Sequence, residues 1–183
     1  MAVWILLAII VIVIVALVVM YNNLVQLRVR ADGAWSDIDV QLKRRHDLIP
    51  NLVETVKGYA GHEKGTFENI AKFRSMAMSA QSPGDKAAAE GQLTTALRGL
   101  FAVAENYPQL RASEQFLSLQ SSLKDVEEAL QSARRYYNAV VRDLNAAIQT
   151  FPAVLVAAML GFTPRHFFEM DTATDRDNPQ VKF

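Results

Sequence analysis

The chain has 183 residues, equal numbers of basic and acidic side chains (19 each), no cysteine and a hydrophobic content of 51%. The neutral net charge disfavours nucleic-acid binding, which needs a strongly basic face. The absence of cysteine excludes disulfides and anchoring through a lipidated cysteine. Once an apolar N-terminal run is set aside, the remaining length suits one domain.

That run, Met1–Met20, contains no charged side chain. Residues 3–20 are long enough to cross a bilayer core of about 30 Å, and Trp4 and Tyr21 stand where aromatic rings prefer the lipid–water interface. A cleaved signal peptide would have a basic start, a shorter apolar core and small residues at its end. A core helix would have to be covered on every side. We therefore expect an uncleaved anchor, residues 1–22, that contacts the bilayer through residues 3–20.

Basic residues near the anchor lie only on its C-terminal side, beginning with Arg28 and Arg30. The positive-inside rule then places the N-terminus outside and the following domain in the cytoplasm. The absence of cysteine is compatible with this orientation and with the reverse one.

A heptad seam runs from Ala31 to Tyr59 in steps of four and three, which is typical of a helix packed along its whole length. Nothing before Ala31 forces a break, so the anchor and this helix are expected to be continuous. Pro50 predicts a kink or a helix restart near Leu48. Arg45 is the only polar member of the seam, whose residues are Ala31, Trp35, Ile38, Leu42, Arg45, Ile49, Leu52, Val56 and Tyr59.

Two shorter helices are predicted next. The glycine cluster at residues 58–65 predicts a turn, and a short amphipathic helix follows it. The SPGD stretch at residues 82–85 predicts a second start, because Ser82 can cap a helix and Pro83 suits the first helical position. This helix is expected to end before Pro108.

The longest seam runs from Phe116 to Phe151 and predicts a helix of about 50 Å that Pro152 ends or bends. The following segment, Ala153–Phe162, is apolar but too short to span a membrane. No stretch of the chain alternates in the manner of a strand. The predicted fold is therefore all-α: a transmembrane helix continuing into an antiparallel up-and-down bundle with two long and two shorter helices.

Residues 23–170 would form the bundle domain, and residues 171–183, which lack periodicity, a flexible tail. The seams suit both folding back within one chain and coiled-coil self-association, and the connections of several residues favour the first. Asn138 and Asn145 lie seven residues apart beside the main seam. They suit a buried pair that fixes helix register and exposure to solvent equally well.

Motifs for catalysis or cofactor binding are missing from the sequence. His62-Glu63 would need a second histidine where Thr66 stands to form a zinc-protease motif, and His46 and His166 are isolated. Neither GxGxxG, nor GxxxxGK[ST], nor GxSxG occurs. We therefore expect no catalytic, cofactor-binding or metal-binding residues, no cofactor, no small-molecule substrate and no enzymatic activity.

Lys43-Arg44-Arg45 is the densest basic run. It lies about 30–35 Å beyond the anchor along a straight helix, which is several Debye lengths from the lipid headgroups. We interpret it as a solvated face, with Asp39 and Asp47 among its counter-charges. Recognition of lipid headgroups would require the helix to lie along the membrane.

Several longer blocks resemble a known family. The chain is similar to the bacterial LemA family from the anchor to about Glu169. The resemblance implies a helical bundle on a single-pass anchor in the bacterial inner membrane, with the domain in the cytoplasm and no catalytic residues. The blocks that carry it are YNNLV from Tyr21, AWSDIDVQLKRRHDLIPNLVETVKGYAGHEK from Ala34, AENYPQLRAS from Ala104, ARRYYNAVVRDLNAAIQTFP from Ala133, and GFTPRHFFE.

The favoured function is a non-enzymatic scaffold or adaptor with an integral-membrane partner. The resemblance suggests that it supports envelope maintenance or a membrane protease. The alternative is a self-assembling organiser that forms a ring or array through the anchor and Ala153–Phe162. An enzyme with an unrecognised site is the least favoured hypothesis.

Overall fold

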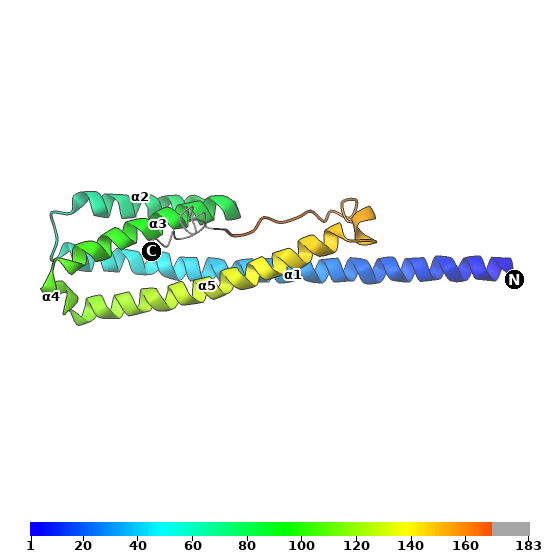
Figure 1. The fold of residues 1–183 in the computed structure, drawn as a ribbon, viewed down its shortest axis with the longest axis horizontal. Coiled ribbons are helices and arrows are strands. Elements are labelled where there is room, and N and C mark those ends of the chain that lie inside the picture. Colours follow the sequence, from blue (N-terminus) through cyan, green and yellow to red (C-terminus); the bar gives the residue numbers. More distant parts are fainter. Residues whose placement is uncertain (170–183) are drawn as a thin grey trace, which may run out of the picture. The chain divides into compact units, whose positions relative to one another are not determined.

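The computed structural model describes residues 1–169, and this part of the chain is helical, with no strand. The expected all-α architecture is confirmed, with two long and two shorter helices and one additional single turn, α4 (Figure 1). The elements of this part are α1 (Ala2–Lys57), α2 (Lys64–Ser79), α3 (Pro83–Glu105), α4 (Pro108–Arg111), α5 (Glu114–Gln149) and the 3-10 turn η1 (Ala153–Leu155).

Local chemistry explains where the helices begin and end. At the start of α3 the Asp85 amide donates to Ser82 Oγ (3.0 Å), and the Ser82 hydroxyl donates to the Asp85 carboxylate (2.7 Å). This cap satisfies a backbone donor that the first helical turn leaves free. The glycine cluster forms the turn between α1 and α2, and α5 ends shortly before Pro152, so these predictions are confirmed.

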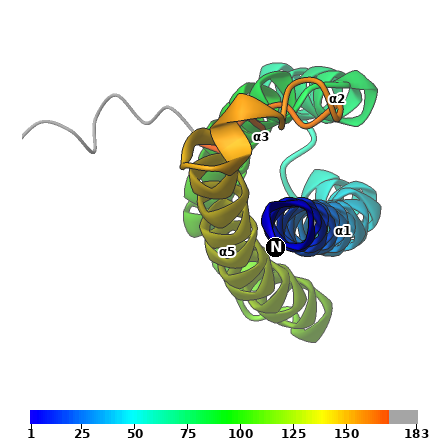
Figure 2. The ribbon, with the colours of Figure 1, turned by 90° about the vertical axis from the view of Figure 1, so that its right-hand side faces the viewer.

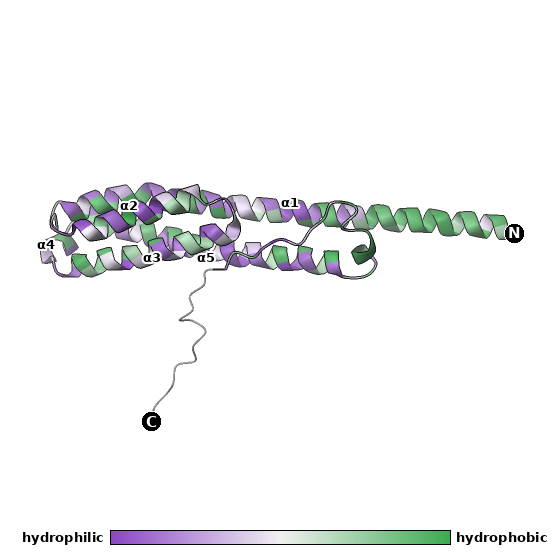
Figure 3. Ribbon diagram, turned by 90° about the horizontal axis from the view of Figure 1, so that it is seen from above, coloured by the Kyte–Doolittle hydropathy of each residue, from purple (hydrophilic) through white to green (hydrophobic). Residues whose placement is uncertain are grey.

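Helix α1 is continuous from Ala2 to Lys57 and passes through Pro50. The predicted continuity is confirmed. Of the two alternatives at Pro50, the restart near Leu48 does not occur, and the kink stays a prediction. Within residues 1–169, α1 is the one helix long and apolar enough to cross a membrane, and none of its apolar window is buried against protein. Figure 3 shows this run as an unbroken hydrophobic stretch at the N-terminal end of α1.

By their internal contacts the described residues divide into two compact units. Unit 1 comprises Met1–Ile38 and Ala133–His166, and unit 2 comprises Asp39–Ser132 and residues 167–169 of the described range. Both α1 and α5 therefore contribute a segment to each unit.

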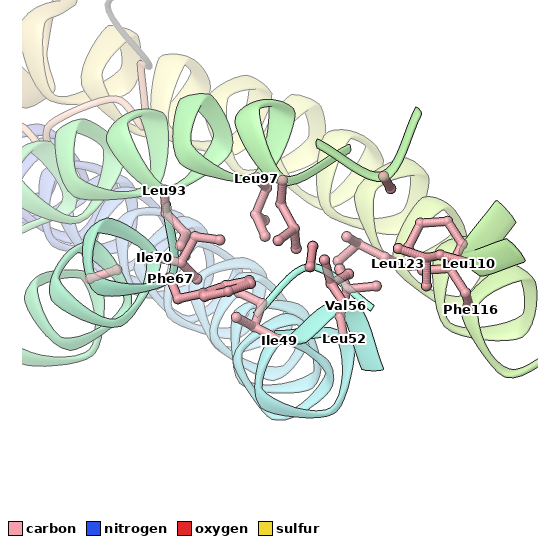
Figure 4. Close-up of a cluster of buried hydrophobic side chains, with 14 of the residues drawn as sticks. Ile49, Leu52, Val56, Phe67, Ile70, Leu93, Leu97, Leu110, Phe116 and Leu123 are labelled. Carbon is pink, nitrogen blue, oxygen red and sulfur yellow. The ribbon is translucent and has the colours of Figure 1, made fainter. Parts of the chain in front are cut away.

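Unit 2 is a four-helix bundle. The chain reverses direction at each connection between its helices (Figure 1), and α2 and α3 pack side by side, as the end-on view in Figure 2 also shows. Its core draws apolar side chains from every helix of the unit (Figure 4). The core residues include Ile49, Leu52, Val56, Phe67, Ile70, Leu93, Leu97, Leu110, Phe116 and Leu123.

Unit 1 is built from α1, α5 and the segment that follows α5. Its core contains Ala153, Ala157 and Phe162, so the apolar segment after Pro152 folds back and packs on the two long helices. The remaining buried members of this core are Leu24, Ala31, Val140, Leu144 and Ile148.

The residues of the two long predicted seams are buried or half-buried in the structure, with two exceptions. Tyr59 is 44% exposed and Phe151 is 80% exposed. Both residues lie just beyond the last residue of their helix, Lys57 and Gln149 respectively. Past that point the 3.6-residue period no longer decides the direction of a side chain.

The predicted domain boundaries at residues 22 and 170 stay predictions. The first would separate a membrane anchor from the bundle and the second the bundle from its tail, whereas the two units are distinguished by contacts within the protein. The predicted flexible tail, residues 171–183, lies outside the described residues.

Candidate functional site

A layer of polar side chains crosses the interior of unit 2. Two of its members, Arg45 and Glu90, are almost fully buried, and His46 is 7% exposed. Every long helix segment of the unit contributes to it. This polar layer consists of Arg45 and His46 from α1, Arg74 from α2, Glu90 and Thr94 from α3, and Glu127 from α5.

Arg45 lies at the centre of the polar layer. Its Nη1 donates to Glu90 Oε2 at 2.5 Å, and its Nη2 lies 2.7 Å from both Thr94 Oγ1 and Glu127 Oε1. His46 Nε2 is 2.6 Å from the other oxygen of Glu90. Glu90 is therefore held by two neighbours on α1, and its burial is compensated by charge and hydrogen bonding.

The electrostatics of Glu90 follow from these contacts. Burial by itself would raise the pKa of its carboxyl, because a charged group loses its hydration in the protein interior. The hydrogen bond with His46 and the positive charge of Arg45 outweigh this effect and hold the pKa of Glu90 below its usual value. The carboxylate thus stays ionised at neutral pH.

Pro50 explains the place of Arg74 in the polar layer. A proline has no amide hydrogen, so it leaves the carbonyl four residues earlier in the helix, that of His46, without its helical donor. The Nε of Arg74 donates to this carbonyl oxygen at 2.9 Å. A side chain of α2 thereby replaces the missing backbone hydrogen bond, and α1 continues as a helix.

A groove between α3 and α5 reaches the polar layer. Its volume is about 620 Å³, and Arg45, Thr94 and Glu127 line it. Both carboxylates of the layer are paired with Arg45, and the Thr94 hydroxyl also donates to the Glu90 carbonyl at 2.9 Å. This arrangement joins helices to one another and leaves neither carboxylate as an unpaired base.

A second polar site lies in unit 1, where Gly161–His166 runs along α5. We call this segment the strap. Asn145 Nδ2 donates to the Arg165 carbonyl (2.9 Å), and the Arg165 amide donates to Asn145 Oδ1 (2.8 Å). The side-chain amide thus forms the two-point pairing that a neighbouring backbone would form. Tyr137 holds the next residue, because its hydroxyl donates to the His166 carbonyl at 3.0 Å.

Charged residues of α1 also hold the strap. Arg165 Nη2 is 2.6 Å from Asp32 Oδ1, and Arg28 donates to the Gly161 carbonyl at 2.7 Å. Burial raises the pKa of the Tyr137 hydroxyl, an effect that the charge of Arg165 opposes and that of Asp32 reinforces. Tyr137 therefore remains a neutral donor to the strap.

The three residues of the basic run, Lys43-Arg44-Arg45, differ in their exposure to solvent. Lys43 and Arg44 are exposed, as a solvated face requires, but Arg45 is 1% exposed, so this interpretation is wrong for Arg45. The reason is its place in the seam, which turns the guanidinium toward the interior of the bundle. Asp47, by contrast, is exposed and points away from its buried neighbour His46.

The two asparagines do not have equivalent positions. Asn145 is partly buried and binds the strap, so it is not simply exposed to solvent. Asn138 is also partly buried. His166 contributes its backbone carbonyl to the strap, as the acceptor of the Tyr137 hydroxyl. Its side chain is exposed.

Sequence reasoning missed Glu90, although a signal was present. Glu90, Leu93, Leu97 and Leu100 follow one another in steps of three and four, so Glu90 continues the apolar face of α3. All four are buried. A lone acid in one seam and the lone base Arg45 in another would have suggested a buried pair. Arg74 carried a similar signal, because it follows Phe67 and Ile70 in steps of three and four. Glu127 carried none, because it lies beside the seam and not in it.

The described residues contain no group of three or more His, Cys, Asp or Glu side chains placed to hold a metal ion. The expectation that the chain has no catalytic, cofactor-binding or metal-binding residues stays a prediction.

Comparisons with known proteins agree with the resemblance noted above. The LemA family model matches residues 34–183. Magnetosome protein MamQ of Magnetospirillum gryphiswaldense is 26% identical over 92% of this chain and 72% of its own length. Magnetosome protein MamQ 2 of Paramagnetospirillum magneticum is 24% identical, over 88% of this chain and 69% of its own length.

Protein LemA of Metamycoplasma hominis is 27% identical over 76% of this chain, and the match spans 64% of that relative's length. The apolar run of α1 and these relatives together support association with a membrane. The family match covers most of the chain, including the polar layer and the strap, and the chain therefore belongs to the LemA family.

Proposed function

We propose that the chain is a non-enzymatic helical scaffold or adaptor tethered to a membrane through residues 3–20. One observation carries the proposal: α1 runs without interruption from the apolar run into residues that build both helical units. The helix that would cross the bilayer is thus also part of the folded protein. The family resemblance favours envelope maintenance or a membrane protease as the setting of this role.

The use of the buried polar groups supports a structural role. In unit 2 they join four helix segments, and in unit 1 they hold the strap on α5. Ion pairs and amide pairings of this kind specify which surfaces meet. The names of the relatives state no enzymatic activity.

We further propose that the protein lies in the inner membrane with its N-terminus outside and its helical units in the cytoplasm. Arg28 and Arg30 support this orientation, because basic residues flanking a span are retained on the cytoplasmic side. Single cysteines can test it, since the chain has none. A membrane-impermeant maleimide should label A2C in intact cells and S79C only after lysis. The reverse labelling would overturn the orientation.

The adaptor role is tested by purifying the full-length protein with native lipid and measuring the mass of the complex. We expect a stoichiometric complex with an integral-membrane protein. A homo-oligomer would instead support the self-assembling organiser, and a monomer without a partner would contradict both. A matched variant with residues 3–20 replaced by leucines shows whether the span or the helical units bind the partner.

A further inference from the structure

A cluster of exposed apolar side chains lies directly after α5, in unit 1. We call residues 151–160 the apolar collar. Met159 is 87% exposed, Phe151 80% and Leu155 66%. Val154 and Leu160 are also at least 42% exposed. A monomeric protein in water rarely presents so many large apolar groups together.

The apolar collar is folded and not a loose connection. Ala153 and Ala157 are buried in the core of unit 1, and the Ala157 amide donates to the Ala153 carbonyl at 2.8 Å. Its end is a Schellman motif: the Phe162 amide donates to the Ala157 carbonyl (2.9 Å), and Gly161 adopts a φ of 75°. The exposed side chains are therefore held on a defined surface.

The sequence of the collar explains why that surface has no polar face. An amphipathic segment at a protein–water boundary has charged residues on its outer side. Here no charged residue occurs between Asp143 and Arg165. Both faces of the collar are apolar, and only the inner face is covered by protein.

The collar lies against the last turn of the apolar run of α1. Leu17, Val18 and Tyr21 of α1 line one hollow of about 340 Å³ together with Val156, Met159 and Leu160 of the collar. The ring of Tyr21 also meets that of Phe162 edge-on, with the centroids 5.8 Å apart. The collar thus lies at the end of the run, where the hydrocarbon core gives way to headgroups.

A charged residue marks the boundary of this apolar surface. The guanidinium of Arg28 donates to the Gly161 carbonyl and lies 4.2 Å from the centroid of the Phe162 ring. Arg28 follows the apolar run by about two helical turns, at the height expected for headgroups. The buried Phe162 ring therefore contacts both the Tyr21 ring and the Arg28 cation where the collar ends.

We propose that the apolar collar is a second membrane-contacting element, inserted into the boundary between headgroups and acyl chains in the leaflet from which α1 emerges. The inference rests on the proposed span, residues 3–20, and adds a lipid-binding surface from the other end of the chain. The collar adjoins the proposed span, and this continuity favours phospholipid as the molecule that covers it. The hollow that the collar shares with Leu17 and Val18 would already lie within the bilayer. The collar and α1 together then hold unit 1 at the membrane surface by two elements.

The test uses the full-length chain with one cysteine at a time, labelled with an environment-sensitive fluorophore. The protein is reconstituted into phosphatidylcholine–phosphatidylglycerol vesicles whose acyl chains are brominated near the headgroup or near the bilayer centre. The three sites are M159C in the collar, I10C in the span, and Y136C on α5. Tyr136 is the matched control, since it is a large exposed residue of the same unit, 54% exposed.

We expect the fluorophore at M159C to be quenched by the shallow bromine and that at I10C by the deep one, while Y136C is quenched by neither. Quenching at I10C with M159C behaving as Y136C would overturn the collar proposal and leave the span intact. Absence of quenching at I10C would overturn the span and the collar together. A blue-shifted but unquenched M159C signal would show that protein, such as a second copy, covers the collar and would also overturn the proposal.

A charge substitution controls for insertion driven by the fluorophore. Leu155 is 66% exposed and is not a member of the core of unit 1, so L155D leaves that core in place. In the M159C background, L155D should reduce the shallow quenching at residue 159 and leave that of I10C unchanged. Unchanged quenching at residue 159 would show that the label and not the collar enters the lipid.

Discussion

Glu90 is the most deeply buried charged residue of the polar layer in unit 2. It is fully buried, and its two oxygens contact Arg45 and His46 of α1. A buried ion pair gains little over a well-packed apolar pair, because both ions lose their hydration, but removing one partner leaves an uncompensated charge. The polar layer therefore adds little net stability. Its role is to favour one arrangement of the helices over the alternatives.

Glu90→Gln should lower the free energy of unfolding by about 1–3 kcal/mol, because Arg45 loses its fully buried counter-charge and keeps only the partly exposed Glu127. The measurement is chemical unfolding of the full chain in detergent micelles. The control is Glu68→Gln on the exposed face of α2, which should change stability by less than about 0.5 kcal/mol. Equal effects of the two substitutions would contradict the role assigned to Glu90.

The same pair should show a defined pH dependence. The pKa of Glu90 in the folded protein lies below its ordinary value of 4.5. Its contribution to stability is therefore complete above pH 4.5 and is lost as the pH falls through the lowered pKa. The difference in stability between wild type and E90Q should shrink in that acid range. A constant difference from pH 7 to well below 4.5 would show that the charge of Glu90 is not responsible.

Among the elements, α1 is unusual because it continues through a proline. An internal proline removes a helical hydrogen bond and crowds the preceding turn, which costs about 3 kcal/mol in an isolated helix. In unit 2 the carbonyl that Pro50 leaves free receives a hydrogen bond from Arg74. The continuity of α1 therefore depends on a residue of α2.

Arg74→Met should destabilise the protein by about 1–3 kcal/mol, because it leaves the His46 carbonyl without a donor. In a Pro50→Ala background the residue at position 50 supplies its own amide hydrogen, so Arg74→Met should cost clearly less. Unfolding of the four proteins of this double-mutant cycle measures the coupling. Additive effects would show that Arg74 does not replace the helical hydrogen bond.

The strap is the second element whose position depends on side chains of other elements. Asn145 makes both hydrogen bonds to the Arg165 backbone. Tyr137, Asp32 and Arg28 contribute one contact each. An extended segment has no hydrogen bonds of its own to maintain its path. Removal of the Asn145 amide should therefore release the strap before it unfolds either helix.

Asn145→Ala should speed hydrogen exchange at the Arg165 amide and trypsin cleavage after Arg165, with a loss of about 1–3 kcal/mol in local stability. Arg142→Gln, at an exposed position of α5, is the control and should leave both rates unchanged. Unchanged exchange at Arg165 in N145A would indicate that the ion pair with Asp32 suffices to hold the strap.

For the whole molecule, the decisive feature is that α1 serves as proposed span and as part of both units. No separate linker joins the apolar run to the folded protein, since the helix is continuous from Ala2 to Lys57. A partner that binds the helical units would therefore be tethered to the membrane. This is the property expected of a scaffold.

Two charges within the run should abolish this attachment. I10K combined with I14K places lysines on one face of the span, at a cost of about 2.5–3.5 kcal/mol each near its centre. The full chain should then leave the carbonate-resistant membrane pellet, while the I10L/I14L control stays in it. Retention of the double-lysine chain in the pellet would contradict a span at residues 3–20.

Much of the fold was predictable because helical periodicity is a local property. The seams of α1 and α5, the Ser82 cap and the turn after Lys57 all follow from residues within a few positions of one another. The predictions that were wrong also relied on local sequence alone. Tyr59 and Phe151 continue the spacing beyond the ends of their helices, and the restart at Pro50 fails because Arg74, distant in sequence, supplies the missing donor.

The sequence by itself determined the apolar run, the all-α class, the order of the helices and the family. Only the tertiary structure decided that Arg45 faces Glu90, that Asn145 holds the strap, and that residues 151–160 lie beside the end of the apolar run. The physical reason is the distance along the chain over which each property is decided. The period of a helix is set within each turn, whereas the partner of a buried polar group depends on which helix faces meet, and the packing of the whole chain decides that.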